Sequence, residues 1–153
     1  MKLFPWQKQK EFFTSEEKKL VVDAIQKAEQ RTSGEVRVFV ESRCRFVDAI
    51  DRAKELFFQL DMDKTEERNG TIVYVAVKDR QAAVFGDEGI HQKLGQKYWE
   101  EKINKMMVCF KQASLADGII QCVSDIGEAL YQNFPYDNKT DKNELPDDIV
   151  FGR

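Results

Sequence analysis

Acidic side chains follow two apolar runs in this sequence, at points where strands are expected to end. Asp79 comes shortly after residues 72–77, and Asp87 and Glu88 come shortly after residues 81–85. Carboxylates that crowd together need a cation or a proton to offset their repulsion, and their oxygens suit Ca²⁺ or Mg²⁺. If both loops lie over the same rim of a sheet, the sequence predicts a divalent-cation site there.

Structural roles compete with this interpretation. Asp79 and Arg80 can form a simple hairpin turn, while Asp87 and Glu88 can favour the N-terminus of the next helix through its dipole. Successive hairpin strands also place Asp79 and Asp87 at opposite ends of their strands. Both interpretations stay open at this level.

Two further catalytic motifs lack the context that they need. Residues 61–65 match the D-x-D-x-T nucleophile motif of haloacid-dehalogenase-like phosphatases, but they follow a helical apolar stripe, where that motif needs a buried strand. His91 is the only histidine, and the sequence contains no G-x-S-x-G nucleophile motif. His91 is therefore predicted to be a solvent-facing polar residue.

The three cysteines are predicted to be free thiols. Their number is odd and no C-x-x-C pair occurs, which argues against a disulfide framework and against a zinc site. Cys109 and Cys122 fall at apolar positions of predicted helices. Cys44 lies between two arginines, which can lower a thiol pKa. A phosphatase loop of the C-x5-R type, however, would need arginine where Ile50 stands.

Composition limits the class of protein. The 153 residues suit one domain, and 24 Lys and Arg against 27 Asp and Glu give a net charge of −3. That balance is too close to neutral to indicate nucleic acid or an anionic membrane as the main partner. The longest apolar run is far shorter than the roughly 20 residues of a membrane span, and no secretory h-region is visible. We expect a cytoplasmic protein without membrane insertion.

Apolar periodicity and turn signals predict the element order α-β-α-β-β-α-α. The expected elements are a helix behind the capping box of Thr14 and Glu17, a strand at 35–41, a helix with an apolar stripe over 46–60, a strand at 71–77 opened by Asn69-Gly70, a hairpin strand at 81–85, a helix whose stripe runs over 94–110, and a helix capped by Ser114 that Pro135 ends. This order predicts an α/β three-layer sandwich, in which a small mixed β-sheet, a βαβ unit plus a hairpin, is flanked by helices on both faces.

The chain is expected to divide into three segments. Residues 1–13 form an N-terminal aromatic arm, residues 14–135 the α/β domain, and residues 136–153 an acidic flexible tail. Within that tail, the apolar patch Ile149-Val150-Phe151 is the part that can dock on the domain or on a partner.

Several short motifs occur in order among the predicted helices and strands: Thr32-Ser33-Gly34-Glu35, Asn69-Gly70, Asp79-Arg80, the glycine loop at 86–90 and Asp117-Gly118-Ile119. Taken in this order over residues 12–134, the sequence resembles the TPM domain family, which includes thylakoid-lumen and photosystem II repair proteins. The glycine loop is longer by one residue than the family's usual G-x-G.

The resemblance implies a function as well as a fold. Some plant members are described as calcium-binding acid phosphatases, and others act as auxiliary factors for membrane protein complexes. By this resemblance, the candidate metal ligands are Asp79, Asp87, Glu88 and Asp117, with Asn69 and Arg80 nearby. We expect a non-catalytic or weakly catalytic TPM-domain protein that binds Ca²⁺ or Mg²⁺ through acidic loops and also binds a protein partner. The alternative is a divalent-metal-dependent acid phosphatase-like hydrolase, with the ion as Lewis acid.

Overall fold

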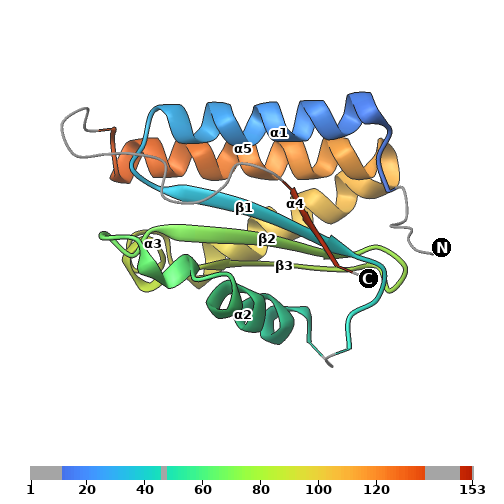
Figure 1. Cartoon of the computed structure of the whole chain (residues 1–153), viewed down its shortest axis with the longest axis horizontal. Coiled ribbons are helices and arrows are strands. Elements are labelled where there is room, and N and C mark those ends of the chain that lie inside the picture. Colours follow the sequence, from blue (N-terminus) through green and yellow to red (C-terminus); the bar gives the residue numbers. More distant parts are fainter. Residues whose placement is uncertain (1–11, 46–47, 137–148, 153) are drawn as a thin grey trace.

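The computed structural model describes residues 12–45, 48–136 and 149–152, and it places a four-stranded sheet between two layers of helices (Figure 1). The elements are α1 (Ser15–Gln30), β1 (Glu35–Glu41), α2 (Ala49–Gln59), the 3-10 helix η1 (Met62–Lys64), β2 (Gly70–Ala76), β3 (Gln81–Gly86), α3 (Glu88–Leu94), α4 (Gln96–Gln112), α5 (Leu115–Asn133) and β4 (Ile149–Phe151). The predicted α/β three-layer sandwich is confirmed.

The sheet has the strand order β3-β2-β1-β4. Strand β1 runs parallel to β2 and to β4, and β3 runs antiparallel to β2. The βαβ unit and the hairpin are therefore present as predicted. Strand β4 is additional, because the apolar patch in the predicted tail pairs with β1, where Ile149 lies opposite Val38.

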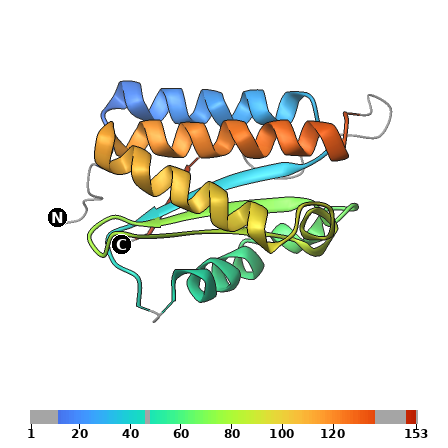
Figure 2. The same cartoon turned by 180° about the vertical axis from the view of Figure 1, so that it is seen from behind.

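Each face of the sheet packs against its own helices. Valines 36, 38 and 40 of β1 point into the larger core, which α1, α4 and α5 cover. On the opposite face, Phe39 and Tyr74 pack against Phe57 of α2 in a second cluster. Alternation along the strands produces this division, since successive side chains point to opposite faces. Figure 2 shows α4 and α5 on the first face from the reverse side.

Helix boundaries follow local signals with one exception. The capping box is confirmed: the amide of Glu17 donates to Thr14 Oγ1 at 3.0 Å, and the amide of Thr14 donates to Glu17 Oε1 at 2.9 Å. The single helix expected after the hairpin is instead two, α3 and α4. Gly95 separates them with φ 84°, a left-handed conformation that ends one helix and redirects the chain into the next.

The two ends of the described chain meet at the sheet. Phe13 is buried, and its ring centroid lies 6.1 Å from that of Phe151 in β4. The remainder of the predicted arm, residues 1–11, and of the predicted tail, residues 137–148 and 153, lies outside the described residues. Within the described part, no helix is long and apolar enough to cross a bilayer.

Candidate functional site

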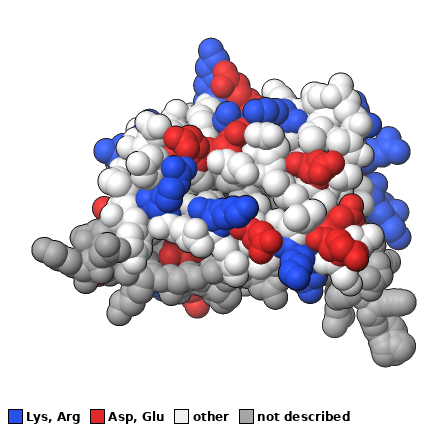
Figure 3. All heavy atoms as spheres, turned by 90° about the horizontal axis from the view of Figure 1, so that it is seen from above, with Lys and Arg blue, Asp and Glu red and all other residues white. Residues whose placement is uncertain are grey.

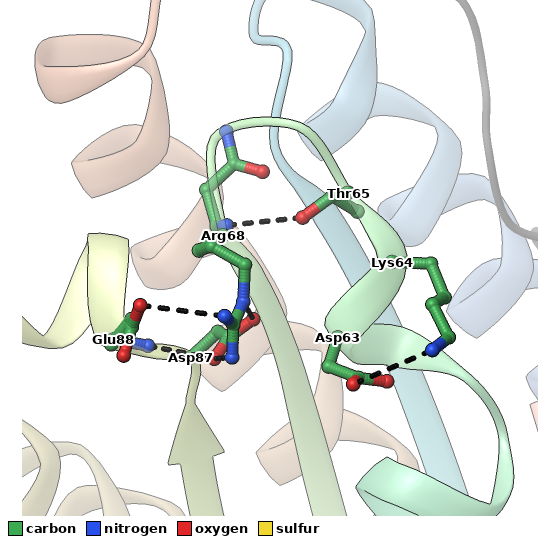
Figure 4. A network of polar contacts seen from close by, with 7 residues as sticks. Asp63, Lys64, Thr65, Arg68, Asp87 and Glu88 are labelled. Atoms are coloured by element: carbon green, nitrogen blue, oxygen red, sulfur yellow. Dashed lines mark hydrogen bonds and ion pairs between the residues drawn. The ribbon is translucent and has the colours of Figure 1, made fainter.

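Two of the predicted acidic residues meet an arginine where β2 begins and β3 ends; we call Arg68, Asp87 and Glu88 the acidic end. Arg68 donates to both carboxylate oxygens of Asp87, from Nε at 2.6 Å and from Nη2 at 2.8 Å. Its Nη1 also donates to Glu88 Oε2 at 3.3 Å (Figure 4). The carboxylates face a guanidinium that bridges them.

Backbone geometry fixes this arrangement. Asp87 caps α3, since its Oδ1 accepts the amide of Glu88 at 2.8 Å, and its own amide donates to the carbonyl of Gly70 at 2.9 Å. The amide of Gly89 donates to the carbonyl of Arg68 at 2.8 Å. A Cβ on Gly89 would lie 2.1 Å from the carbonyl oxygen of Glu67, so only glycine permits this approach.

The buried carboxylate of the acidic end has its positive partner within the protein. The Asp87 side chain is 3% exposed and that of Arg68 39% exposed. Hydrogen bonding to Asp87 raises the pKa of Arg68, and the charges of Asp87, Glu88 and Asp63 act in the same direction. As placed, these residues do not fit a divalent ion, because the guanidinium occupies both oxygens of Asp87. Over the described residues, no three His, Cys, Asp or Glu side chains are grouped to hold a metal.

Asp79 lies at the other end of β3, in the β2–β3 turn. Its Oδ1 accepts a bond from Arg43 Nη1 at 2.9 Å, and its Oδ2 accepts the backbone amide of Cys44 at 2.7 Å. Asp79 therefore braces the loop that follows β1. The hairpin keeps Asp79 apart from Asp87 and Glu88, so the shared rim on which the predicted cation site depended does not form.

The other predicted site residues have separate positions. Asn69 is buried and donates from Nδ2 to Ser33 Oγ at 3.1 Å. Asp117 is exposed in the first turn of α5, and its amide donates to the capping hydroxyl of Ser114 at 3.0 Å. Arg80 is exposed in the β2–β3 turn, with φ 54°. None of these three joins the acidic end through a hydrogen bond or ion pair that we observe in the described residues.

A second group of charged residues surrounds a pocket of about 630 Å³ at the carboxyl ends of β1 and β2. We call it the basic pocket. Its lining is Glu41, Ser42, Arg43, Cys44, Arg45, Arg52 and Lys78. The strands hold its two loops together, because the amide of Lys78 donates to the carbonyl of Ser42 at 2.7 Å. Ligands of open α/β sheets commonly bind at this edge.

Beneath the basic pocket lies a buried polar network. Glu41 accepts two bonds from Arg52, at 2.9 and 3.0 Å, and one from the Tyr74 hydroxyl at 2.5 Å. Burial, and then the hydrogen bond to Glu41, raise the pKa of Tyr74, and the bond to Glu41 raises that of Arg52. Glu41 is thus neutralised from within, which leaves Arg43, Arg45 and Lys78 as the exposed charges of the pocket.

The basic pocket was missed by sequence reasoning, although its signal was present. The sequence predicts strand ends at both loops that build it, but the overall charge balance, which is close to neutral, does not show that cations gather there. Three of its cations come from residues 43–52 and the fourth from Lys78, and only the parallel pairing of β1 with β2 brings them together.

Other reactive side chains are tied to the core. His91 is not simply solvent-facing as predicted, because its Nδ1 accepts a bond from Trp99 Nε1 at 2.9 Å. Cys122 is buried, as predicted for a core cysteine, and burial raises its thiol pKa to about 12. Cys44 and Cys109 are half-buried and form no disulfide in the described part of the chain. Residues 61–65 follow α2 rather than a strand, which agrees with rejecting the dehalogenase-like motif.

Known proteins share both sequence and fold with this chain. The sequence model of the TPM domain family matches residues 7–129, most of the chain. This chain belongs to the TPM domain family. The solved NMR structure of BA42 from the psychrophilic bacterium Bizionia argentinensis is 39% identical to it, covering 95% of this chain and 99% of that one at a TM-score of 0.85. A search of curated proteins found no significant match.

Two more distant structures share the fold alone. The N-terminal domain of cg2496 from Corynebacterium glutamicum is 14% identical, with a TM-score of 0.61 over 77% of this chain and 74% of that one. The N-terminal domain of a protein from P. gingivalis is also 14% identical, with a TM-score of 0.68 over 81% of this chain and 80% of that one.

Proposed function

We propose that this TPM-domain protein is a binding module that recognises a phosphate or phosphoester group in the basic pocket. The observation that carries the proposal is the excess of unpaired positive charge at the carboxyl edge of the parallel strands. Arg45 and Lys78 are exposed and make no ion pair that we observe among the described residues, and Arg43 is 69% exposed beside its one bond to Asp79. Arginine forks suit phosphate oxygens, and lysine adds a point charge.

The concentration of positive charge distinguishes this edge from the face formed by α1 and α5. On the face formed by α1 and α5, positive and negative side chains are interspersed (Figure 3). In the basic pocket four cations accompany one carboxylate, Glu41, which is itself satisfied internally. A protein with a net charge of −3 thus keeps a local positive field, which attracts an anion over about one Debye length, roughly 8 Å in physiological salt.

Binding is favoured over catalysis by the state of the reactive groups. The one histidine accepts a bond from Trp99, and Asp79, the carboxylate that pairs with Arg43 of the pocket, also accepts the Cys44 amide. The phosphatase-like alternative would need Asp79 to hold a metal or to accept a proton. It remains the second proposal, supported only by the position of Asp79 beside the basic pocket.

A divalent cation at the acidic end is a further proposal, and a weaker one. Asp87 and Glu88 lie close to each other, but Arg68 already supplies the positive charge there. An ion would have to displace the guanidinium.

An amide NMR titration with inorganic phosphate at constant ionic strength tests the main proposal. We expect shifts at residues 42–45 and 78, and loss of most of the affinity in Arg45→Gln. The control Lys19→Gln removes an equal charge from exposed α1 and should bind as the unaltered protein does. Amide shifts spread evenly over surface lysines would contradict a specific site. So would an equal loss of phosphate affinity in both variants.

Alkylation gives a second readout, because Cys44 lines the pocket while the equally half-buried Cys109 lies on α4. Phosphate should slow iodoacetamide modification of Cys44 and leave that of Cys109 unchanged.

The variant Asp79→Asn separates phosphate binding from phosphate-ester hydrolysis. A binding module keeps or gains phosphate affinity when this negative charge is removed, whereas a metal-dependent phosphatase loses turnover of a phosphate ester.

A further inference from the structure

A groove of about 440 Å³ lies on the other side of the β2–β3 turn from the basic pocket. It is bounded by the end of β2, the last turns of α4 and the start of α5, and its apolar lining includes Val77, Phe110 and Leu115. All three side chains are only partly buried, and all pack against the larger core. The volume lies within the usual range of ligand pockets, roughly 300–1,000 Å³.

Two cations stand at this groove. Arg80 comes from the β2–β3 turn and Lys111 from the last turn of α4. Both are exposed, and neither side chain makes an ion pair or hydrogen bond that we observe with another described residue. Apolar surface beside two free cations is complementary to a group that has an apolar body and an anionic end.

A third feature narrows the class of ligand. Gln81 also lines the groove, and its Oε1 is buried without a hydrogen-bond partner in the described part of the chain. A buried acceptor needs a donor, because leaving it unsatisfied is costly. A fatty acid in its anionic form offers no donor, whereas a peptide offers amide N–H groups beside its apolar side chains.

Arg80 also holds a costly backbone conformation. Its φ of 54° lies in the left-handed region, which glycine or asparagine adopts more easily than arginine. Such outliers are concentrated at functional positions, where the side chain is needed despite its backbone.

We propose that this groove binds the C-terminal tail of a partner protein that ends in a large apolar residue. The terminal carboxylate pairs with Arg80 and Lys111, the apolar side chain packs against Phe110 and Leu115, and a backbone amide donates to Gln81 Oε1. Capture of a terminal carboxylate together with an adjacent apolar side chain is a recurring mode of peptide recognition. The inference is independent of phosphate binding in the basic pocket, with which the groove shares no lining residue.

The test is an amide NMR titration of the full chain with an acetylated pentapeptide that ends in leucine with a free carboxylate. We expect shifts at Val77, Gln81, Phe110 and Leu115. The same peptide with a C-terminal amide should bind at least about ten-fold more weakly, because it loses the charged hydrogen bonds. A peptide ending in serine should lose affinity as well, through the missing apolar contact.

Variants locate the site on the protein. Arg80→Asn keeps a residue that tolerates positive φ, and Lys111→Gln removes the second cation; each should weaken the leucine peptide about ten-fold. The matched control Lys97→Gln removes an exposed cation from the first turn of the same helix and should leave binding unchanged. Equal binding of the amidated peptide, or absence of shifts in the groove, would overturn the proposal. So would octanoate that binds in the groove as tightly as the peptide, since that ligand brings no amide donor.

Discussion

The two ends of the β2–β3 hairpin each carry an arginine in a left-handed conformation, Arg68 with φ 51° and Arg80 with φ 54°. Arg68, which precedes β2, gives its guanidinium to the buried carboxylate of Asp87 and to Glu88. Arg80, in the turn between the strands, stays exposed at an apolar groove. The two arginines thus share a backbone conformation but differ in role. The role depends on whether the guanidinium contacts carboxylates of the protein or stays exposed.

The same contrast extends to the charges around each arginine. At the acidic end, one arginine bonds to two carboxylates, so the buried carboxylate of Asp87 already has a positive partner within the protein. At the other end, Glu41 and Asp79 are satisfied by Arg52, Tyr74, Arg43 and a backbone amide, and further cations remain for a ligand. The acidic residues that first suggest chemistry are therefore structural in their contacts, while the unpaired cations are the groups available to bind.

The largest expected effect compares Asp87→Ala with Asp79→Ala. Removing the Asp87 carboxylate breaks a nearly buried pair and the cap of α3, so we expect a loss of about 3 kcal/mol, the low end for a broken buried ion pair. The equivalent change at Asp79, whose partner Arg43 is 69% exposed, should cost about 1 kcal/mol. Urea unfolding measures both. Equal losses would show that the two ends are built alike.

The sequence predicts the strands and helices at both ends of the hairpin, but not the side-chain contacts that distinguish them. Periodicity located β1, β2, β3 and the long helices, because those signals are local. Arg68 and Asp87 are 19 positions apart and meet only when β3 returns beside β2, so no short motif relates them. The same applies to the three-residue strand β4, whose pairing with β1 spans most of the chain.

Candidate residues were identified more accurately than their roles. Asp79, Asp87 and Glu88 were chosen because acidic loops follow strands, and they do lie at strand ends. The sequence could not reveal that each already has a cationic partner, because pairing depends on side-chain direction across the hairpin. Nor did it show the break at Gly95, since a single glycine can also be tolerated inside a helix.

The second prediction concerns alkaline pH and the network beneath the basic pocket. Burial raises the pKa of Tyr74, so in the folded protein this phenol stays protonated above pH 10, while in the unfolded chain it ionises near its usual value of about 10. The contribution of Tyr74 to the free energy of unfolding is therefore fully present below pH 10. It falls as the pH rises above 10, by up to about 1.4 kcal/mol per pH unit.

Comparison with Tyr74→Phe isolates this contribution, because burial also raises the pKa of Tyr98 and of Cys122. Urea unfolding at several pH values between 9 and 11 should give a shallower decline for the variant. Identical slopes would mean that the unfolded and folded chains ionise this phenol alike.

The third prediction asks whether Arg68 takes the place of an external cation. In Arg68→Gln, the carboxylates of Asp87 and Glu88 lose their positive partner, and Ca²⁺ should then stabilise the variant. The expected gain is about 1.4 kcal/mol at a concentration ten times the Kd, whereas the unaltered protein should show a smaller gain or none. Arg43→Gln is the control, because it exposes a single carboxylate, Asp79. A Ca²⁺ response as large in the unaltered protein would mean that Arg68 yields to the ion.

The smallest expected change in the free energy of unfolding comes from substituting each of the two arginines by asparagine. Arg80→Asn places a residue that tolerates the left-handed region in the same turn, and no ion pair that we observe among the described residues is lost, so the free energy of unfolding should rise by about 0.5 kcal/mol. Arg68→Asn relieves the same backbone cost but removes the bonds to Asp87 and Glu88, so stability should fall. Opposite signs in urea unfolding would show that Arg68 is kept for folding and that Arg80 is kept for something other than stability. A loss of stability in Arg80→Asn would instead mean that its side chain supports the domain by packing over the groove, and the peptide site would then have to rest on Lys111 and Gln81.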